Sequence, residues 1–173
     1  EIEVFALGGL CINVEGRCYL SSFVTGASTN TEGACSPSRF VRFNSVPDGG
    51  MTISLNNVLL NRLSATESSP YPTCCKGRYK TSDGKVTYSL EDPESLNVLP
   101  ILPGLIAAGA SAVKIQGRQR TKSYVAAMTG VLREAVDACY KNHAGYTVRP
   151  EWKARTIATF EGTKETLGSY LVK

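Results

Sequence analysis

The distribution of cysteines is the feature that most limits how this chain can fold. Five of the six cysteines lie between positions 11 and 75, in a stretch rich in glycine, serine, threonine and asparagine. Residues 13–47 hold only short apolar pieces and could hardly build a hydrophobic core, whereas a metal centre would supply the missing folding energy. We therefore interpret four of these thiols as ligands of one metal centre: Cys11, Cys18, Cys35 and one of the pair Cys74 and Cys75.

The composition is that of an ordinary globular protein. Of 173 residues, 42% are hydrophobic and 20% charged, and the net charge is +4. This mild charge neither requires nor excludes an RNA partner. No apolar run approaches the roughly 20 residues that a membrane-spanning helix needs, so we expect no membrane span and a cytoplasmic protein with reduced thiols. The alternative of three disulfides is disfavoured by the adjacent Cys74 and Cys75.

The start of the chain suggests a piece of a longer protein. Residue 1 is Glu, no initiator Met or signal peptide precedes it, and residues 1–7 already have the pattern of a strand. We expect Gly8 and Gly9 to form a tight turn after this strand, which would place Cys11 at the carboxyl end of the strand.

Apolar periodicity further predicts a mixed order of helices and strands. Residues 51–63 are apolar enough for a strand or short helix, and residues 79–90 resemble a hairpin. Residues 96–108 have near-helical spacing, residues 112–116 suggest a strand, and Thr121 is positioned to cap a helix that ends near position 140. The expected buried stripe of that helix is Val125, Met128, Val131, Leu132, Ala135 and Cys139.

Arg118 and Arg120 lie between the last predicted strand and this helix, a place that attracts anions. They are candidate binders of a substrate carboxylate, and the alternative is that both are solvated surface charges. The only histidine, His143, follows the long helix and is expected at the surface. A hydrolase that uses a Ser-His or Cys-His pair is therefore not favoured.

Several segments resemble peptidase family U32, over nearly the whole chain but only the C-terminal half of a typical member. They are residues 3–11 (EVFALGGLC), 16–22 (GRCYLSS), 33–37 (GACSP) and 113–118 (VKIQGR). Within the family, the resemblance is strongest to the UbiU branch of oxygen-independent ubiquinone biosynthesis. It rests on residues 17–22, 36–42 (SPSRFVR) and 75–79 (CKGRY).

The resemblance implies an α/β fold, the C-terminal half of a TIM-barrel-like domain with an irregular iron–sulfur-binding insertion and without its N-terminal half. Residues 1–90 would hold the first strand and the insertion, 91–141 the final α/β unit, and 142–173 a C-terminal tail. The implied cofactor is a 4Fe–4S cluster held by Cys11, Cys18, Cys35 and Cys75, with Cys74 as the fallback for Cys75. Cys139 would be a core residue.

The implied activity is oxygen-independent hydroxylation of a ubiquinone precursor, a prenylated phenol, with prephenate as the oxygen donor. The implied partners are a UbiV-like family member, as a heterodimer, and a UbiT-like lipid carrier. Two positions depart from the family pattern: Leu7 stands where other branches carry His, and Gln116 where Glu is frequent. Both departures weaken a role for these positions in catalysis.

Three other functions stay open. Sister branches are implied to hydroxylate bases of tRNA or rRNA, which would need a basic, aromatic-bearing face; only Arg39 and Arg42, near Phe40 and Phe43, suggest one. A collagenase-type peptidase is implied by the family name. A structural zinc site would use the same four thiols without catalysis.

Overall fold

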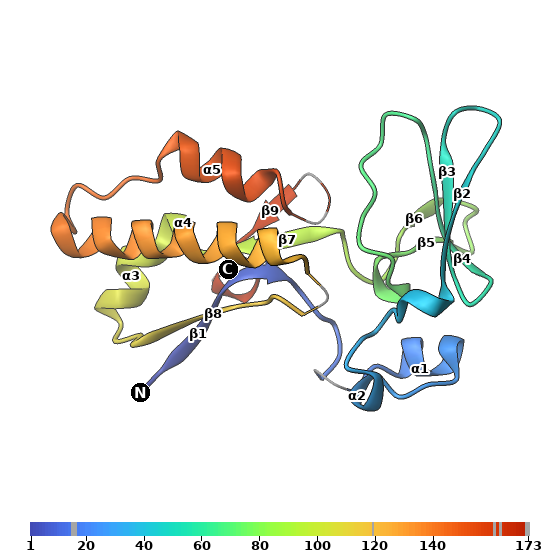
Figure 1. Ribbon diagram of the computed structural model, residues 1–173, viewed down its shortest axis with the longest axis horizontal. Helices are drawn as coiled ribbons and strands as arrows, with labels where there is room; N and C mark the ends of the chain where they lie inside the picture. The colour runs from blue at the N-terminus through green and yellow to red at the C-terminus, as the bar shows by residue number, and fades with distance from the viewer. Residues whose placement is uncertain (15–16, 119, 161, 163, 172–173) are drawn as a thin grey trace. The chain divides into compact units, whose positions relative to one another are not determined.

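The computed structural model describes residues 1–14, 17–118, 120–160, 162 and 164–171 (Figure 1). The chain divides into two compact units. We call the first the sheet–helix unit, formed by Glu1–Leu10 and Glu94–Lys173, and the second the cysteine unit, formed by Cys11–Pro93. The cysteine unit is therefore an insertion between the first strand of the sheet–helix unit and all its other elements.

The sheet–helix unit contains a four-stranded sheet in the order β8-β1-β7-β9. Its strands are β1 (Glu3–Gly9), β7 (Glu94–Asn97), β8 (Ala112–Ile115) and β9 (Lys164–Thr166). β1 runs parallel to β8 but antiparallel to β7. The expected α/β class is confirmed, but the expected half of a TIM barrel is not seen in the described residues. Barrel strands are all parallel, whereas β7 returns from the insertion alongside β1 in the opposite direction.

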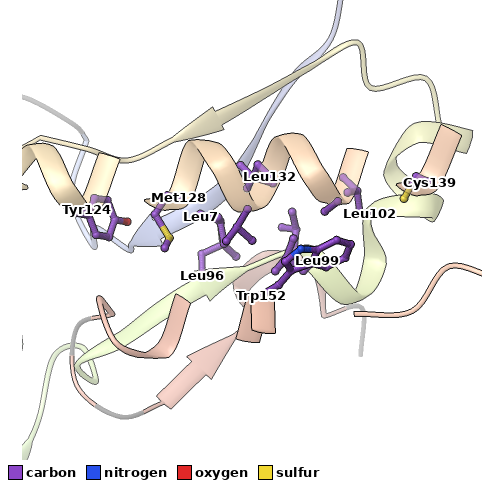
Figure 2. Close-up of a cluster of buried hydrophobic side chains, with 13 residues drawn as sticks. Leu7, Leu96, Leu99, Leu102, Tyr124, Met128, Leu132, Cys139 and Trp152 are labelled. Carbon is purple, nitrogen blue, oxygen red and sulfur yellow. The ribbon is translucent and has the colours of Figure 1, made fainter. Parts of the chain in front are cut away.

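The longest helix, α4 (Lys122–Lys141), is capped as expected, because the Thr121 hydroxyl accepts a hydrogen bond from the Tyr124 backbone N–H at 3.1 Å. Its predicted stripe is buried except at Val125, which is 41% exposed, and Tyr124 is buried instead. Figure 2 shows this core, in which α4 packs against residues of β1 and β7. Its labelled members are Leu7, Leu96, Leu99, Leu102, Tyr124, Met128, Leu132, Cys139 and Trp152.

One predicted helix is shorter than expected. The near-helical spacing over 96–108 gives α3 only at Leu102–Ala107, because Leu96 lies in β7 and a 3-10 turn, η3 (Leu99–Ile101), separates the two. Pro100 lacks a backbone N–H and disfavours helical geometry at the residue before it, so the helix cannot extend back to the strand.

The C-terminal segment completes the core of the sheet–helix unit. In α5 (Pro150–Ile157), Trp152 is fully buried and its indole N–H donates to Glu134 at 2.8 Å. The last elements are β9 and the 3-10 turn η4 (Gly168–Tyr170), from which the Tyr170 hydroxyl donates to the Phe5 carbonyl at 2.8 Å. In the described part of the chain, no helix combines the length and hydrophobicity that a bilayer crossing requires.

The cysteine unit is built from short elements around two antiparallel sheets. They are α1 (Tyr19–Thr25), α2 (Thr29–Glu32), η1 (Ser38–Phe40), β2 (Val41–Ser45), β3 (Met51–Leu55), β4 (Val58–Leu63), η2 (Cys74–Lys76), β5 (Arg78–Lys80) and β6 (Val86–Tyr88). β5 and β6 confirm the predicted hairpin. Residues 51–63 form two strands, joined by Asn56 and Asn57 at φ values of 44° and 67°. Asparagine tolerates this left-handed conformation, which permits the tight turn.

Candidate metal centre

The six cysteines all lie in described residues, and no disulfide joins any two of them. Cys11 is exposed, Cys18, Cys35 and Cys75 are partly buried, and Cys74 and Cys139 are buried. Cys139 packs in the core of the sheet–helix unit, as predicted. The other five belong to the cysteine unit, and the alternative of a disulfide framework is not seen.

The pKa shifts of the buried thiols indicate that all five cysteines of this unit, Cys74 included, influence one another. Burial, together with the charges of Cys75, Cys18 and Cys11, raises the pKa of Cys35 to about 11. Burial likewise raises the pKa of Cys75; the Thr73 hydrogen bond and the Lys76 charge lower it, and Cys11 and Cys18 raise it. Burial and the charges of Cys18, Cys75 and Cys35 also raise the pKa of Cys74 to about 11. Because such effects decay with distance, they indicate that Cys11, Cys18, Cys35 and Cys75 lie in one neighbourhood, and that Cys74 lies there too.

Four thiols in one unit are the donors that a 4Fe–4S cluster would need, and the presence of such a cluster stays a prediction. Among the described histidine, cysteine and acidic side chains, no group of three is placed to hold one metal ion. A 4Fe–4S cluster instead takes one thiolate at each of four iron atoms. Because the pKa values of Cys35 and Cys75 are raised, these two thiols would have to lose protons on binding a metal, so that binding would be coupled to proton release.

Cys18 is held at the start of α1, where its side chain caps the helix. The Cys18 sulfur accepts from the Ser21 backbone N–H at 3.4 Å and from the Asn13 side-chain amide at 3.6 Å. The Cys18 backbone N–H donates to the Thr29 hydroxyl at 3.2 Å, which ties this residue to α2. Glu15 and Gly16, between Cys11 and Cys18, lie outside the described residues.

Cys35 lies in the link between α2 and η1. Gly33 ends α2 with a φ of 67°, a conformation that glycine adopts without strain. The neighbouring Ser36 hydroxyl is buried and donates to the Pro72 carbonyl at 2.5 Å. This bond ties the Cys35 segment to Pro72, which lies two residues before Cys74.

Cys75 lies in the 3-10 turn η2, in which the backbone carbonyls are all hydrogen-bonded. The Tyr79 hydroxyl donates to Cys74 O at 2.6 Å, the Glu91 backbone N–H to Cys75 O at 3.1 Å, and the Asn61 amide to Lys76 O at 3.2 Å. These contacts hold the turn from three separate segments. They constrain the backbone from which the Cys75 side chain extends.

The adjacent cysteines have different surroundings. Cys74 is 3% exposed and packs with Leu55 and Leu60 in the core of the cysteine unit. Cys75 is only partly buried, and its sulfur lies 3.3 Å from the Thr73 hydroxyl. Cys74 thus has the surroundings of a small core residue, and the role of Cys75 as the fourth ligand stays a prediction.

Arg118 and Arg120, by contrast, belong to the sheet–helix unit. Arg118 is exposed, and the Arg120 guanidinium lies over the Tyr124 ring at 5.3 Å from its centroid. Gln119 lies outside the described residues. Gln116 accepts from the Arg118 backbone N–H at 3.4 Å, a long contact. The carboxylate-binding role of the two arginines stays a prediction.

Several site residues escaped the sequence analysis. Asn13, Ser21 and Thr73 contact the sulfurs of Cys18 and Cys75, and Tyr79 holds η2. A polar residue two or three positions from a cysteine is a weak signal that could have indicated Ser21 and Thr73, whereas Asn13 lies five positions from Cys18. Nothing in the sequence indicated that the Tyr79 hydroxyl would reach back to Cys74.

These features define a mixed α/β protein with a cysteine-bearing insertion. Residues 1–170 match the sequence profile of peptidase family U32, and the chain belongs to this family. No solved structure matches the chain significantly.

The relatives of this chain include RNA hydroxylation proteins and a collagenase. A tRNA hydroxylation protein P1 of Bacillus subtilis is 27% identical over 94% of this chain and 35% of its own length. A 23S rRNA 5-hydroxycytidine C2501 synthase of Escherichia coli is 29% identical over 79% of this chain and 16% of its own length. A collagenase of Porphyromonas gingivalis is 28% identical over 80% of this chain and 29% of its own length. The chain thus spans about a third or less of these relatives.

Proposed function

We propose that this chain is the cluster-bearing part of a protein that hydroxylates a pyrimidine base of tRNA or rRNA. The observation that carries the proposal is the gathering of Cys11, Cys18, Cys35 and Cys75 in one unit of a chain that is similar to two RNA hydroxylation proteins. These four thiolates would hold a 4Fe–4S cluster, which supplies one-electron transfer when bound.

A second candidate is oxygen-independent hydroxylation of a prenylated phenol in ubiquinone biosynthesis. It is favoured by residues 17–22, 36–42 and 75–79, which resemble the UbiU branch. In this case the protein would pair with a UbiV-like member and receive substrate from a UbiT-like carrier. Arg118 and Arg120 would bind a carboxylate of prephenate, since guanidinium groups pair with carboxylates through two hydrogen bonds.

A peptidase function has less support from the described residues. The His143 Nε2 atom lies 3.2 Å from the Pro103 carbonyl oxygen, so this imidazole contacts a backbone acceptor rather than a nucleophile. A general base must lie within hydrogen-bonding distance of the group that it activates. We therefore do not propose a peptidase activity for this chain, although some relatives are named collagenases.

One set of measurements distinguishes these functions. Full-length protein prepared without oxygen should be brown and contain about four irons and four sulfides. Cells that lack the protein should be complemented with the wild type or with Cys35→Ala, and their RNA nucleosides and quinones compared by mass spectrometry. Loss of a hydroxylated pyrimidine in the Cys35→Ala strain supports the proposal.

Other outcomes would contradict it. Unchanged RNA with a loss of ubiquinone during anaerobic growth would establish the second candidate. A colourless protein that contains zinc would leave a structural metal site, because zinc has no redox chemistry.

A further inference from the structure

Two aromatic side chains of α1 project into solvent. Tyr19 is 80% exposed and Phe23 is 91% exposed. They are four residues apart in a helix and therefore lie on the same face, one turn from each other. Exposed rings of this size, side by side, are uncommon on a protein surface that has no binding role.

The orientation of α1 is fixed by its opposite face. Leu20 and Val24 are partly buried and pack against the core that contains Leu55 and Leu60. The Asn56 amide also donates to the Val24 carbonyl at 2.7 Å. The helix cannot rotate to bury Tyr19 and Phe23 without exposing Leu20 and Val24, so the exposure of the two rings is a property of the folded unit.

The aromatic pair adjoins the candidate metal centre in the same unit. α1 begins directly after Cys18, and Tyr19 is the next residue in the chain. Since the Cys18 sulfur also caps the helix, the first aromatic ring and the proposed ligand belong to one rigid turn. A planar group that stacks on this face would therefore be held close to the Cys18 end of the helix.

The surrounding charge suits a polyanion. Arg17 is exposed, and among the described residues it forms no ion pair. The first turn of α1 has no acidic residue. The Glu32 carboxylate of α2 is occupied by both terminal nitrogens of Arg39, at 2.7 and 2.6 Å. The same pairing removes Arg39 from the basic face that the sequence had suggested.

We propose that Tyr19, Phe23 and Arg17 form a surface that holds a single-stranded segment of RNA. The two rings would stack on bases, and Arg17 would pair with a phosphate, the combination by which proteins bind single strands. This inference rests on the proposed function and adds to it the state of the substrate. The target base would be presented unpaired, from a loop or after leaving a helix.

The test uses full-length protein and a fluorescent single-stranded RNA oligonucleotide, with anisotropy as the readout. Tyr19→Ala and Phe23→Ala should each weaken RNA binding by about tenfold, whereas Tyr19→Phe and Phe23→Tyr should keep it. Tyr140→Ala is the matched control, because Tyr140 is 76% exposed on α4 of the other unit. Log affinity falls as log salt concentration rises, and Arg17→Gln should make this negative slope shallower by about one, because one phosphate contact is lost.

Three outcomes would overturn the proposed surface. RNA affinity within twofold of the wild type in the Tyr19→Ala, Phe23→Ala double variant would exclude the surface, as would a wild type that binds no RNA. A double variant that loses thermal stability or iron would show that the rings pack against another part of the protein. A wild type that leaves RNA unmodified, yet needs the two rings for RNA binding, would refute the proposed function and not the surface.

Discussion

The hydroxyl oxygen of Thr73 lies 3.3 Å from the sulfur of Cys75. If Cys75 binds iron as a thiolate, this hydroxyl must donate the hydrogen bond, because the sulfur has no proton. Hydrogen bonds to ligand sulfurs stabilise the reduced, more negative state of a cluster. Thr73→Val should therefore lower the midpoint potential, measured by a redox titration monitored by electron paramagnetic resonance. Thr73→Ser retains the hydroxyl and should titrate like the wild type; equal potentials in the two variants would refute this role.

The two adjacent cysteines should respond differently to substitution. Cys75→Ala should abolish iron and sulfide binding in the anaerobically prepared protein. Cys74→Ala should retain both and lower the free energy of unfolding by about 1 kcal/mol, since it removes a buried atom from a packed core. Metal analysis and denaturant unfolding measure the two effects. The opposite pattern would make Cys74 the ligand.

Tyr79 should stabilise the turn that carries Cys75. Its hydroxyl donates to the Cys74 carbonyl at 2.6 Å, and Tyr79→Phe removes only this contact. We expect the unfolding free energy to fall by about 1 kcal/mol and iron to be lost faster to a chelator. Tyr88→Phe is a suitable control, because Tyr88 lies in the same hairpin and pairs with Arg78 through its ring. Equal rates of iron loss in the two variants would contradict this prediction.

Glu134 should make the free energy of unfolding depend on pH. Hydrogen bonds from Arg155 and from the Trp152 indole, both at 2.8 Å, lower the pKa of Glu134 from its ordinary value of 4.5. A lowered pKa in the folded state gives stability that is complete above 4.5 and lost as the pH falls through the lowered value. Urea unfolding between neutral pH and about pH 3 should show this loss, and Glu134→Gln should reduce it by the share that Glu134 contributes. An unchanged pH profile in Glu134→Gln would contradict the assignment.

Gly8 should be essential for the contact between β1 and the residue that follows β8. Its φ is +134°, and a Cβ there would lie 2.5 Å from the Gln116 Cβ. Gly8→Ala should therefore lower the free energy of unfolding by about 1–3 kcal/mol. Gly104→Ala is the control: that position is helical, has open space around it, and should gain about 0.5–1 kcal/mol. Thermal unfolding of both variants measures the difference.

Short sequence patterns correctly predicted those elements that depend on residues close together in the chain. The Thr121 cap and the apolar stripe specify α4, and the glycine turn specifies the β5–β6 hairpin. The predictions over 51–63 and 96–108 were less accurate, because short apolar runs fit a helix and a strand equally well. In the first case two consecutive asparagines turn the chain, and in the second Pro100 separates a strand from a helix.

The sequence by itself determined the chemistry available to this protein: six cysteines, one histidine, and the segments that place the chain in peptidase family U32. Only the tertiary structure decided which groups meet. The antiparallel return of β7, the enclosure of Cys74 and the contact between Thr73 and Cys75 all depend on how separate segments pack. Side-chain spacing encodes local periodicity, whereas contacts between distant segments depend on backbone hydrogen bonds and on the burial of apolar surface, which no single stretch of sequence specifies.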